Sequence, residues 1–173
     1  HLSLLYGFSF LTAVLAFAFA AYLYLWVKKQ SVENVRIIEV SALIKEGANT
    51  FMRREYGILV RFAAVAAVLI LLFLPSPIWG GNPLPNIEIA VSYLAGTILS
   101  AIAGKIGILV ATLSNGRTAE AARKGIKPAF LIGFRGGAVM GLLVVGCSLL
   151  GVAAVLMLFD DSSILLGFSF GAS

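Results

Sequence analysis

The sequence has almost no histidine or cysteine, two side chains on which many catalytic and metal sites depend. Among its 173 residues there is one histidine, His1, and one cysteine, Cys147. We therefore expect no Ser-His-Asp site, no internal disulfide and no thiolate metal cluster, and we expect Cys147 to be a packed, inert thiol. The sequence also lacks a glycine-rich loop followed by Lys and Ser or Thr, the pattern that cradles nucleotide phosphates.

Charged residues are scarce as well, at 12% of the sequence against 60% hydrophobic residues, and the mean hydropathy is +1.00. Such a composition is typical of an integral membrane protein. Four apolar runs have lengths suited to crossing a bilayer, and a fifth begins near Ser162. They cover residues 2–27, 58–74, 87–113 and 128–159. The predicted fold class is an all-α integral membrane protein with four transmembrane helices and the start of a fifth, part of a larger helical bundle.

No carboxylate lies in the middle of any apolar run, although ion and proton pathways usually need one. Apart from Arg61 near the start of the second run, two cations fall within the runs, Lys105 and Arg135. Their long stems can carry the charge to the membrane interface, and a paired or ion-path role is the alternative. The adjacent Asp160 and Asp161 are expected to be solvated at a helix end rather than to bind a metal.

Basic residues gather in two of the connections between apolar runs, and residues 75–86 and 160–163 contain none. By the positive-inside rule, the N-terminus is predicted outside and the two basic connections are predicted cytoplasmic. The basic residues lack interleaved aromatic residues, so we expect contact with anionic lipid headgroups and no nucleic acid. The cytoplasmic groups are Lys28, Lys29, Arg36, Lys45, Arg53, Arg54 and Arg61, then Arg117, Arg123, Lys124, Lys127 and Arg135.

The first basic connection contains apolar residues at three- and four-residue steps, which predicts an amphipathic helix over about residues 41–57. Ser41 is its expected N-cap. Because no proline precedes Pro75, the helix should continue into the second span as one rod. The apolar residues are Val40, Leu43, Ile44, Ala48, Phe51 and Met52.

Small residues form stripes along the third and fourth runs. Such stripes allow helix backbones to approach closely in lipid, so they predict helix packing rather than a pore. The predicted packing residues are Gly96, Ser100, Gly104 and Gly107 in the third run, and Gly133, Gly137 and Gly141 in the fourth.

Five segments of the sequence are more specific than any single short motif: IKEGANTFMRREY (44–56), GTILSAIAGKIG (96–107), SNGRTAEAAR (114–123), FRGGAVMGL (134–142) and GFSFGAS (167–173). Together they resemble the membrane-bound, ion-pumping inorganic pyrophosphatases. They occur in the family's order, with its loop lengths and sidedness, and cover most of residues 40–173. Two departures are Lys105, where the family more often has an aromatic or apolar residue, and Leu109, where methionine is usual.

The resemblance implies the N-terminal quarter of a sixteen-helix homodimeric pump, which couples magnesium pyrophosphate hydrolysis to export of protons or sodium ions. The first four helices would belong to an outer ring without catalytic or metal-binding residues. The Mg²⁺ and pyrophosphate sites would follow Ser173, and K⁺ or Na⁺ could act as a further cofactor. Ser173 matches a serine beside the ion gate in some members, which makes it an ion-pathway candidate, with helix packing as the alternative.

A different class of function also fits part of the sequence. In a secondary transporter or channel subunit, the small-residue faces would line a substrate path. However, a helix broken within the membrane would need a proline or glycine interruption inside a span. Four of the prolines lie instead in a connection: Pro75, Pro77, Pro83 and Pro85. A structural membrane subunit is a third possibility. We expect a truncated sequence from a multi-pass protein of a prokaryotic inner membrane, in contact with lipid and with the remaining helices of the pump.

Overall fold

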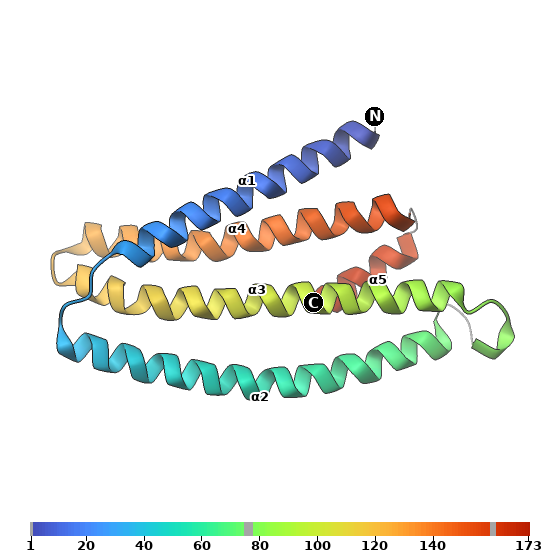
Figure 1. Ribbon diagram of the computed structural model, residues 1–173, viewed down its shortest axis with the longest axis horizontal. Coiled ribbons are helices and arrows are strands. Elements are labelled where there is room, and N and C mark those ends of the chain that lie inside the picture. Colours follow the sequence, from blue (N-terminus) through green and yellow to red (C-terminus); the bar gives the residue numbers. More distant parts are fainter. Residues whose placement is uncertain (1, 75–77, 160–161) are drawn as a thin grey trace. The chain divides into compact units, whose positions relative to one another are not determined.

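A computed structural model describes residues 2–74, 78–159 and 162–173, and this part of the chain is helical, with no strand (Figure 1). Four helices are long and apolar enough to cross a membrane. This confirms the predicted all-α membrane class with the start of a fifth helix. The elements are α1 (Leu2–Lys29), α2 (Val35–Phe73), the 3-10 turn η1 (Ile78–Gly80), α3 (Leu84–Ala122), α4 (Ile126–Phe159) and α5 (Ser162–Ala172). Asp160 and Asp161 lie outside the described residues.

The start of α2 differs from the prediction. The helix begins at Val35, and Asn34 is its N-cap, because the Ile37 amide donates a hydrogen bond to Asn34 Oδ1 at 3.2 Å. Ser41 lies inside the helix, so its assignment as the N-cap was wrong. The polar and β-branched residues 35–40 continue the helix because the cap before them satisfies a first-turn amide. The predicted continuation of this helix into the second span is confirmed.

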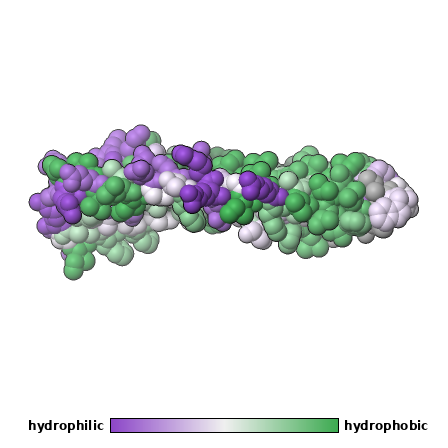
Figure 2. Space-filling model, turned by 90° about the horizontal axis from the view of Figure 1, so that it is seen from below, coloured by the Kyte–Doolittle hydropathy of each residue, from purple (hydrophilic) through white to green (hydrophobic). Residues whose placement is uncertain are grey.

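The composition of α2 changes along its length. Figure 2 views this helix from its outer side, with hydrophilic side chains gathered toward the end at Val35 and apolar side chains toward the end at Phe73. Of the six apolar residues expected on the amphipathic part, Met52 is buried, whereas Leu43 and Phe51 are exposed. Much of the apolar face in this part therefore has no cover among the described residues.

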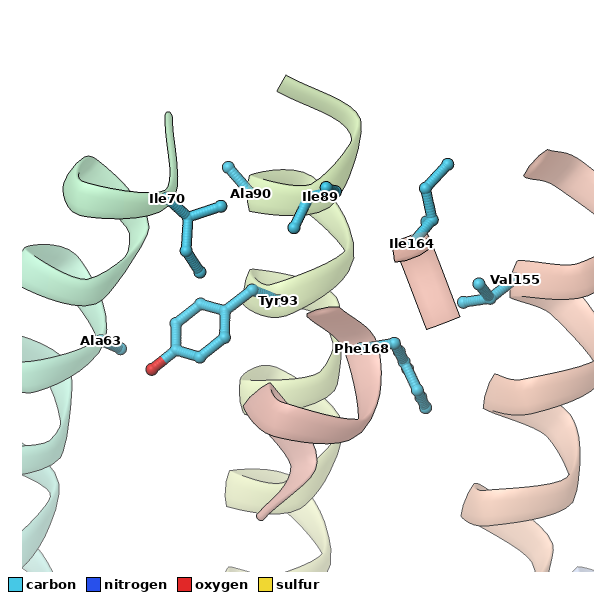
Figure 3. Packing of buried hydrophobic residues seen from close by; sticks show 8 residues of the cluster. All are labelled: Ala63, Ile70, Ile89, Ala90, Tyr93, Val155, Ile164 and Phe168. Atoms are coloured by element: carbon cyan, nitrogen blue, oxygen red, sulfur yellow. The ribbon is translucent and has the colours of Figure 1, made fainter. Parts of the chain in front are cut away.

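The helices pack into two compact units. The first contains His1–Leu11, Arg54–Ile102 and Cys147–Ser173. Its core joins parts of α2, α3, α4 and α5. Figure 3 shows Tyr93 directed from α3 toward α2, and Ile164 and Phe168 of α5 lying between α3 and α4. The buried residues are Ala63, Ile70, Ile89, Ala90, Tyr93, Val155, Ile164 and Phe168.

The second unit contains Thr12–Arg53 and Ala103–Gly146. One cluster of buried side chains joins α1, α3 and α4 through Ala20, Leu23, Val110 and Val139. A second joins the same three helices nearer the end of α1, through Val27, Ala121 and Ile132. Small and β-branched residues predominate in both clusters, as expected where helices approach closely without bulky side chains between them.

Within each unit, α2 and α3 run antiparallel (Figure 1). In the first unit, Asn86 Nδ2 donates to the Leu71 carbonyl at 2.8 Å, and the Tyr56 hydroxyl donates to the Ala101 carbonyl. In the second unit, Ser41 lies against Gly116. Between the two contacts of the first unit, the numbering falls by 15 along α2 and rises by 15 along α3. In the second unit, eleven residues along each antiparallel helix from the contact of Ser41 with Gly116 lie Met52 and Lys105. Lys105 is therefore level with Met52, in the polar part of α2.

Candidate functional site

In the first unit, α3 and α5 approach each other closely at their glycines. A Cβ on Gly96 would lie 2.9 Å from the Ala172 nitrogen, and one on Gly171 would lie 2.9 Å from the Tyr93 carbonyl carbon. A Cβ on Gly167 would come 3.0 Å from the Ile89 oxygen. Each of these neighbours is a backbone atom, which cannot move aside as a flexible side chain could. Glycine is therefore needed on both helices.

The prediction identified Gly96 in this contact but not its partners on α5. Gly167 and Gly171 stand four residues apart near the end of the sequence, which is the spacing of a small-residue stripe. That spacing could have identified them. Ser100 is exposed, and its packing role stays a prediction.

Ser173, the ion-pathway candidate, directly follows α5. Its hydroxyl donates to the Ser169 carbonyl at 2.9 Å, and its amide donates to the Ser169 carbonyl at 3.1 Å. The side chain is exposed. The Ser173 hydroxyl thus bonds to a backbone carbonyl four residues earlier, a common arrangement for serine in a helix. The ion-pathway role of Ser173 stays a prediction.

In the second unit, α3 and α4 form a groove of about 670 Å³. Small residues line much of it, among them Gly104, Gly107 and Ala111 of α3 and Gly133 and Gly137 of α4. We call it the α3–α4 groove. The sequence prediction included four of these five residues as packing positions, and Gly104, Gly107, Gly133 and Gly137 do lie along one groove.

Beside this groove the two helices touch through side chains. A Cβ on Gly107 would lie 2.5 Å from Met140 Sδ, and one on Gly136 would lie 3.0 Å from Ser114 Cβ. Gly136 was not among the predicted packing residues, although it adjoins Gly137 in sequence. By contrast, no described atom outside the local helix lies within 4 Å of a Cβ built on Gly137 or Gly141. Their packing role stays a prediction.

Ser114 lines the groove and is only 7% exposed. Among the described residues its Oγ, which lies against Gly136, has no hydrogen-bond partner. A buried hydroxyl without a partner is uncommon, because desolvating it costs free energy that no hydrogen bond offsets. Sequence analysis missed Ser114, since a lone serine in a helix carries no signal of its burial.

In the second unit, Glu120 and Arg117 form hydrogen bonds with backbone groups near the connection between α1 and α2. Glu120, 8% exposed, accepts hydrogen bonds from the Asn34 amide at 3.2 Å and from Arg123 Nη1 at 3.0 Å. Arg117 donates to the Leu113 carbonyl at 3.0 Å and to the Lys28 carbonyl at 3.2 Å. These bonds satisfy backbone groups at the end of α1 and before α2, so both side chains have a structural role.

The two cations within predicted spans have different surroundings. The Arg135 guanidinium lies 4.0 Å from the centroid of the Trp26 ring, which is a cation–π contact. Lys105 is exposed on α3. The structure therefore gives Arg135 an aromatic partner, and the paired or interfacial role of Lys105 stays a prediction.

The acidic side chains that the structure describes form no cluster. Within residues 2–74, 78–159 and 162–173, no group of three or more His, Cys, Asp or Glu side chains could hold a metal ion. The geometry instead provides helix–helix contacts, satisfied helix ends and the α3–α4 groove. These features position helices, and they suit a membrane scaffold.

Comparison with known proteins gives the family. The family model described as inorganic H⁺ pyrophosphatase matches residues 14–173. The chain belongs to this family. The predicted resemblance is thereby confirmed, and the chain is part of an integral, multi-pass membrane protein.

Individual relatives agree with this assignment to the inorganic H⁺ pyrophosphatase family. The chain is 37% identical over 94% of its length to a "K(+)-insensitive pyrophosphate-energized proton pump" of Methanosarcina mazei, and covers 23% of that protein. It is 36% identical over 87% of its length to a "K(+)-stimulated pyrophosphate-energized sodium pump" of Thermotoga maritima, and covers 19% of that protein. A proton pump of Caldanaerobacter subterraneus is 30% identical over the whole chain, which covers 26% of it. The chain thus spans about a fifth to a quarter of these pyrophosphatase-family proteins.

Proposed function

We propose that this chain is the N-terminal membrane region of an ion-translocating pyrophosphatase, which couples hydrolysis of magnesium pyrophosphate to export of protons or sodium ions. The observation that carries the proposal is the family match over residues 14–173. Its relatives include both proton and sodium pumps, so either ion fits. These relatives do not favour the secondary transporter or channel subunit.

Within such a pump, this segment forms part of the outer scaffold. Two observations support that role. Backbone atoms of α3 and α5 meet at Gly96 and Gly171, which fixes these helices closely together. In addition, the buried acid Glu120 is engaged by Asn34 and Arg123 rather than directed at a substrate. The catalytic residues would lie in the remaining helices of the same protein, with Ser173 nearest to the ion path.

The described residues do not fit a Mg²⁺ site, because their carboxylates are dispersed and Mg²⁺ is bound through carboxylates together with substrate phosphates. We therefore assign no magnesium-dependent step to them. The proposed pump would be a homodimer in a prokaryotic inner membrane, with the N-terminus outside. K⁺ dependence, which differs between the relatives, would be set elsewhere in the protein.

The full-length protein in inverted membrane vesicles would test this function. Magnesium pyrophosphate should be hydrolysed to phosphate, and the vesicle interior should either acidify or accumulate ²²Na⁺. A protonophore should abolish acidification without abolishing hydrolysis, which would separate pumping from leakage. Vesicles from cells carrying the empty vector provide the background.

Two results would contradict the proposal. One is the absence of pyrophosphate hydrolysis by a full-length protein that is correctly inserted and folded. The other is hydrolysis by residues 1–173 alone, since this segment is proposed to lack the catalytic residues. Substrate-dependent ion movement without hydrolysis would instead favour a secondary transporter.

A further inference from the structure

The second unit contains another pocket, of about 300 Å³, between α1, α3 and α4. Its lining includes Ala20, Val110 and Val139, which are at most 2% exposed and form its floor. Leu109, which also lines it, is 40% exposed, so the pocket opens to the surroundings of the helices. We call it the α1 pocket. Its other lining residues are Phe17, Ala21, Tyr24, Ile106 and Leu143.

The size and chemistry of the α1 pocket limit what can fill it. A helix with its side chains is about 10–12 Å across and rises about 5.4 Å per turn, so a single turn needs on the order of 400–600 Å³. The pocket is smaller than that. Apart from the Tyr24 phenol, its lining side chains are hydrocarbon, which suits an acyl chain because such a chain needs no hydrogen bond. The pocket therefore fits a slender apolar ligand better than a further helix.

Lys28 lies on the same face of α1 as the α1 pocket. Phe17, Ala21 and Tyr24 line the pocket and follow one another at steps of four and three residues. Lys28 comes four residues after Tyr24, so it continues the same helix face. At a rise of about 1.5 Å per residue, Lys28 lies about 6 Å beyond Tyr24 and about 17 Å beyond Phe17 along the helix axis. The pocket thus begins about one turn from this lysine and extends away from it.

The end of the α1 pocket nearest Lys28 is positively charged. Lys28 and Lys29 are exposed in the last turn of α1. The guanidinium of Arg117 reaches the same turn, because its Nη2 donates to the Lys28 carbonyl at 3.2 Å. The ion pairs found among the described residues involve neither these lysines nor Arg117. An anion beside Lys28 would therefore meet positive charge that no described carboxylate neutralises.

We propose that the α1 pocket binds an acyl chain of an anionic phospholipid whose phosphate contacts Lys28. The chain lies along α1 from Tyr24 toward Phe17, and the headgroup stays at the end of α1. A net negative headgroup complements the uncompensated cations there, whereas a zwitterionic headgroup carries a positive charge of its own. The inference goes beyond the proposed function, since it requires the bilayer and not a particular pumped ion.

Photocross-linking of the full-length protein tests this site. The protein is reconstituted in phosphatidylcholine vesicles that contain a small fraction of phosphatidylglycerol with a diazirine on one acyl chain. After irradiation, mass spectrometry should find the labelled lipid on Phe17, Leu109 or Leu143. Unlabelled phosphatidylglycerol should compete for this labelling, whereas added phosphatidylcholine should not. Labelling of Phe19, which is exposed on α1 but outside the pocket lining, should show no such competition.

Two charge variants separate a headgroup site from general attraction to the membrane. Lys28→Gln should weaken competition by phosphatidylglycerol about fivefold, as expected for the loss of one lysine beside an anionic headgroup. Lys29→Gln removes the same charge from the next residue, about 100° around the helix, and should weaken competition less than about twofold. Equal losses in the two variants would overturn the proposal, because they would show a diffuse electrostatic attraction.

A filling substitution tests the acyl-chain position separately. Ala21→Phe places a ring in the α1 pocket and should nearly abolish the labelling of Leu109. Ala18→Phe adds the same ring outside the pocket lining and should leave this labelling unchanged. Both alanines are exposed, so neither substitution disturbs a buried contact. Undiminished labelling of Leu109 in Ala21→Phe would contradict the proposed position of the chain.

Two further results would overturn the proposal. One is the absence of label on the pocket residues, as expected if a side chain from elsewhere in the pump fills the pocket. The other is equal labelling by a phosphatidylcholine that carries the same diazirine. Pyrophosphate hydrolysis is measured in the same vesicles. Loss of hydrolysis with the expected labelling intact would count against the proposed function alone, whereas normal hydrolysis without labelling would count against the lipid site alone.

Discussion

At the scale of single residues, the described charged side chains differ in how much they contribute to stability. Glu120 and Arg123 form an ion pair at 3.0 Å in which the glutamate side chain is 11% exposed. Arg36 and Glu39 form a pair of the same spacing at 4.0 Å, but both side chains are largely in solvent. Exposed pairs of this kind contribute little to stability. The chain therefore contains a buried carboxylate and a matched exposed control.

Glu120→Ala is expected to destabilise the protein by about 1–3 kcal/mol, because the Asn34 amide and Arg123 both lose an acceptor. Glu120→Gln keeps an acceptor for the amide, so it should cost less. The measurement is the thermal unfolding midpoint of the full-length protein in detergent. Glu39→Ala should change it little; a larger shift for Glu39→Ala than for Glu120→Ala would contradict this assignment.

The contact between Arg135 and Trp26 gives a second prediction. Trp26→Ala should lower the free energy of unfolding by about 0.5–2 kcal/mol beyond the loss of packing, since the ring face attracts the guanidinium. Trp26→Phe should recover part of that loss. A double-mutant cycle with Arg135→Gln isolates the coupling, and additive effects of the two substitutions would show that the contact contributes nothing.

At the scale of helices, the α3–α5 contact depends on residues that lack a side chain. Gly171→Ala places a Cβ 2.9 Å from the Tyr93 carbonyl carbon and 3.1 Å from the Thr97 nitrogen, so one helix must move. We expect a lower unfolding midpoint of the full-length protein in detergent, because the close backbone contact is lost. Gly57→Ala has no described atom within 4 Å and should be neutral or slightly stabilising, as alanine favours helix. Equal effects of the two substitutions would contradict a specific close contact at Gly171.

At the scale of the whole molecule, the distribution of basic residues sets the expected topology. With the N-terminus outside, Ser31→Cys should react with a membrane-impermeant maleimide only in inverted vesicles. Ser76→Cys should react in intact cells, although Ser76 lies outside the described residues. Both variants are made in a cysteine-free parent. Labelling of Ser31→Cys in intact cells would reverse the predicted orientation.

The sequence by itself determined the membrane class and the order of the helices. Apolar runs of spanning length and the absence of proline before Pro75 are local properties, so they can be read without knowing any partner. The start of α2 was harder to predict from the sequence. Ser41 and Asn34 are both good N-cap residues, and only the observed bond between Asn34 and Ile37 decides between them.

The candidate site was only partly predictable, because a stripe of small residues shows that a helix packs but not against what. Gly96 and Gly107 were both predicted to pack, yet the first meets the backbone of α5 and the second meets Met140 of α4. The burial of Ser114 and Glu120 depends on neighbours more than twelve residues away in sequence, such as Gly136 and Asn34. Sequence periodicity reports which face of a helix is covered, whereas the identity of the covering atoms follows only from the tertiary packing.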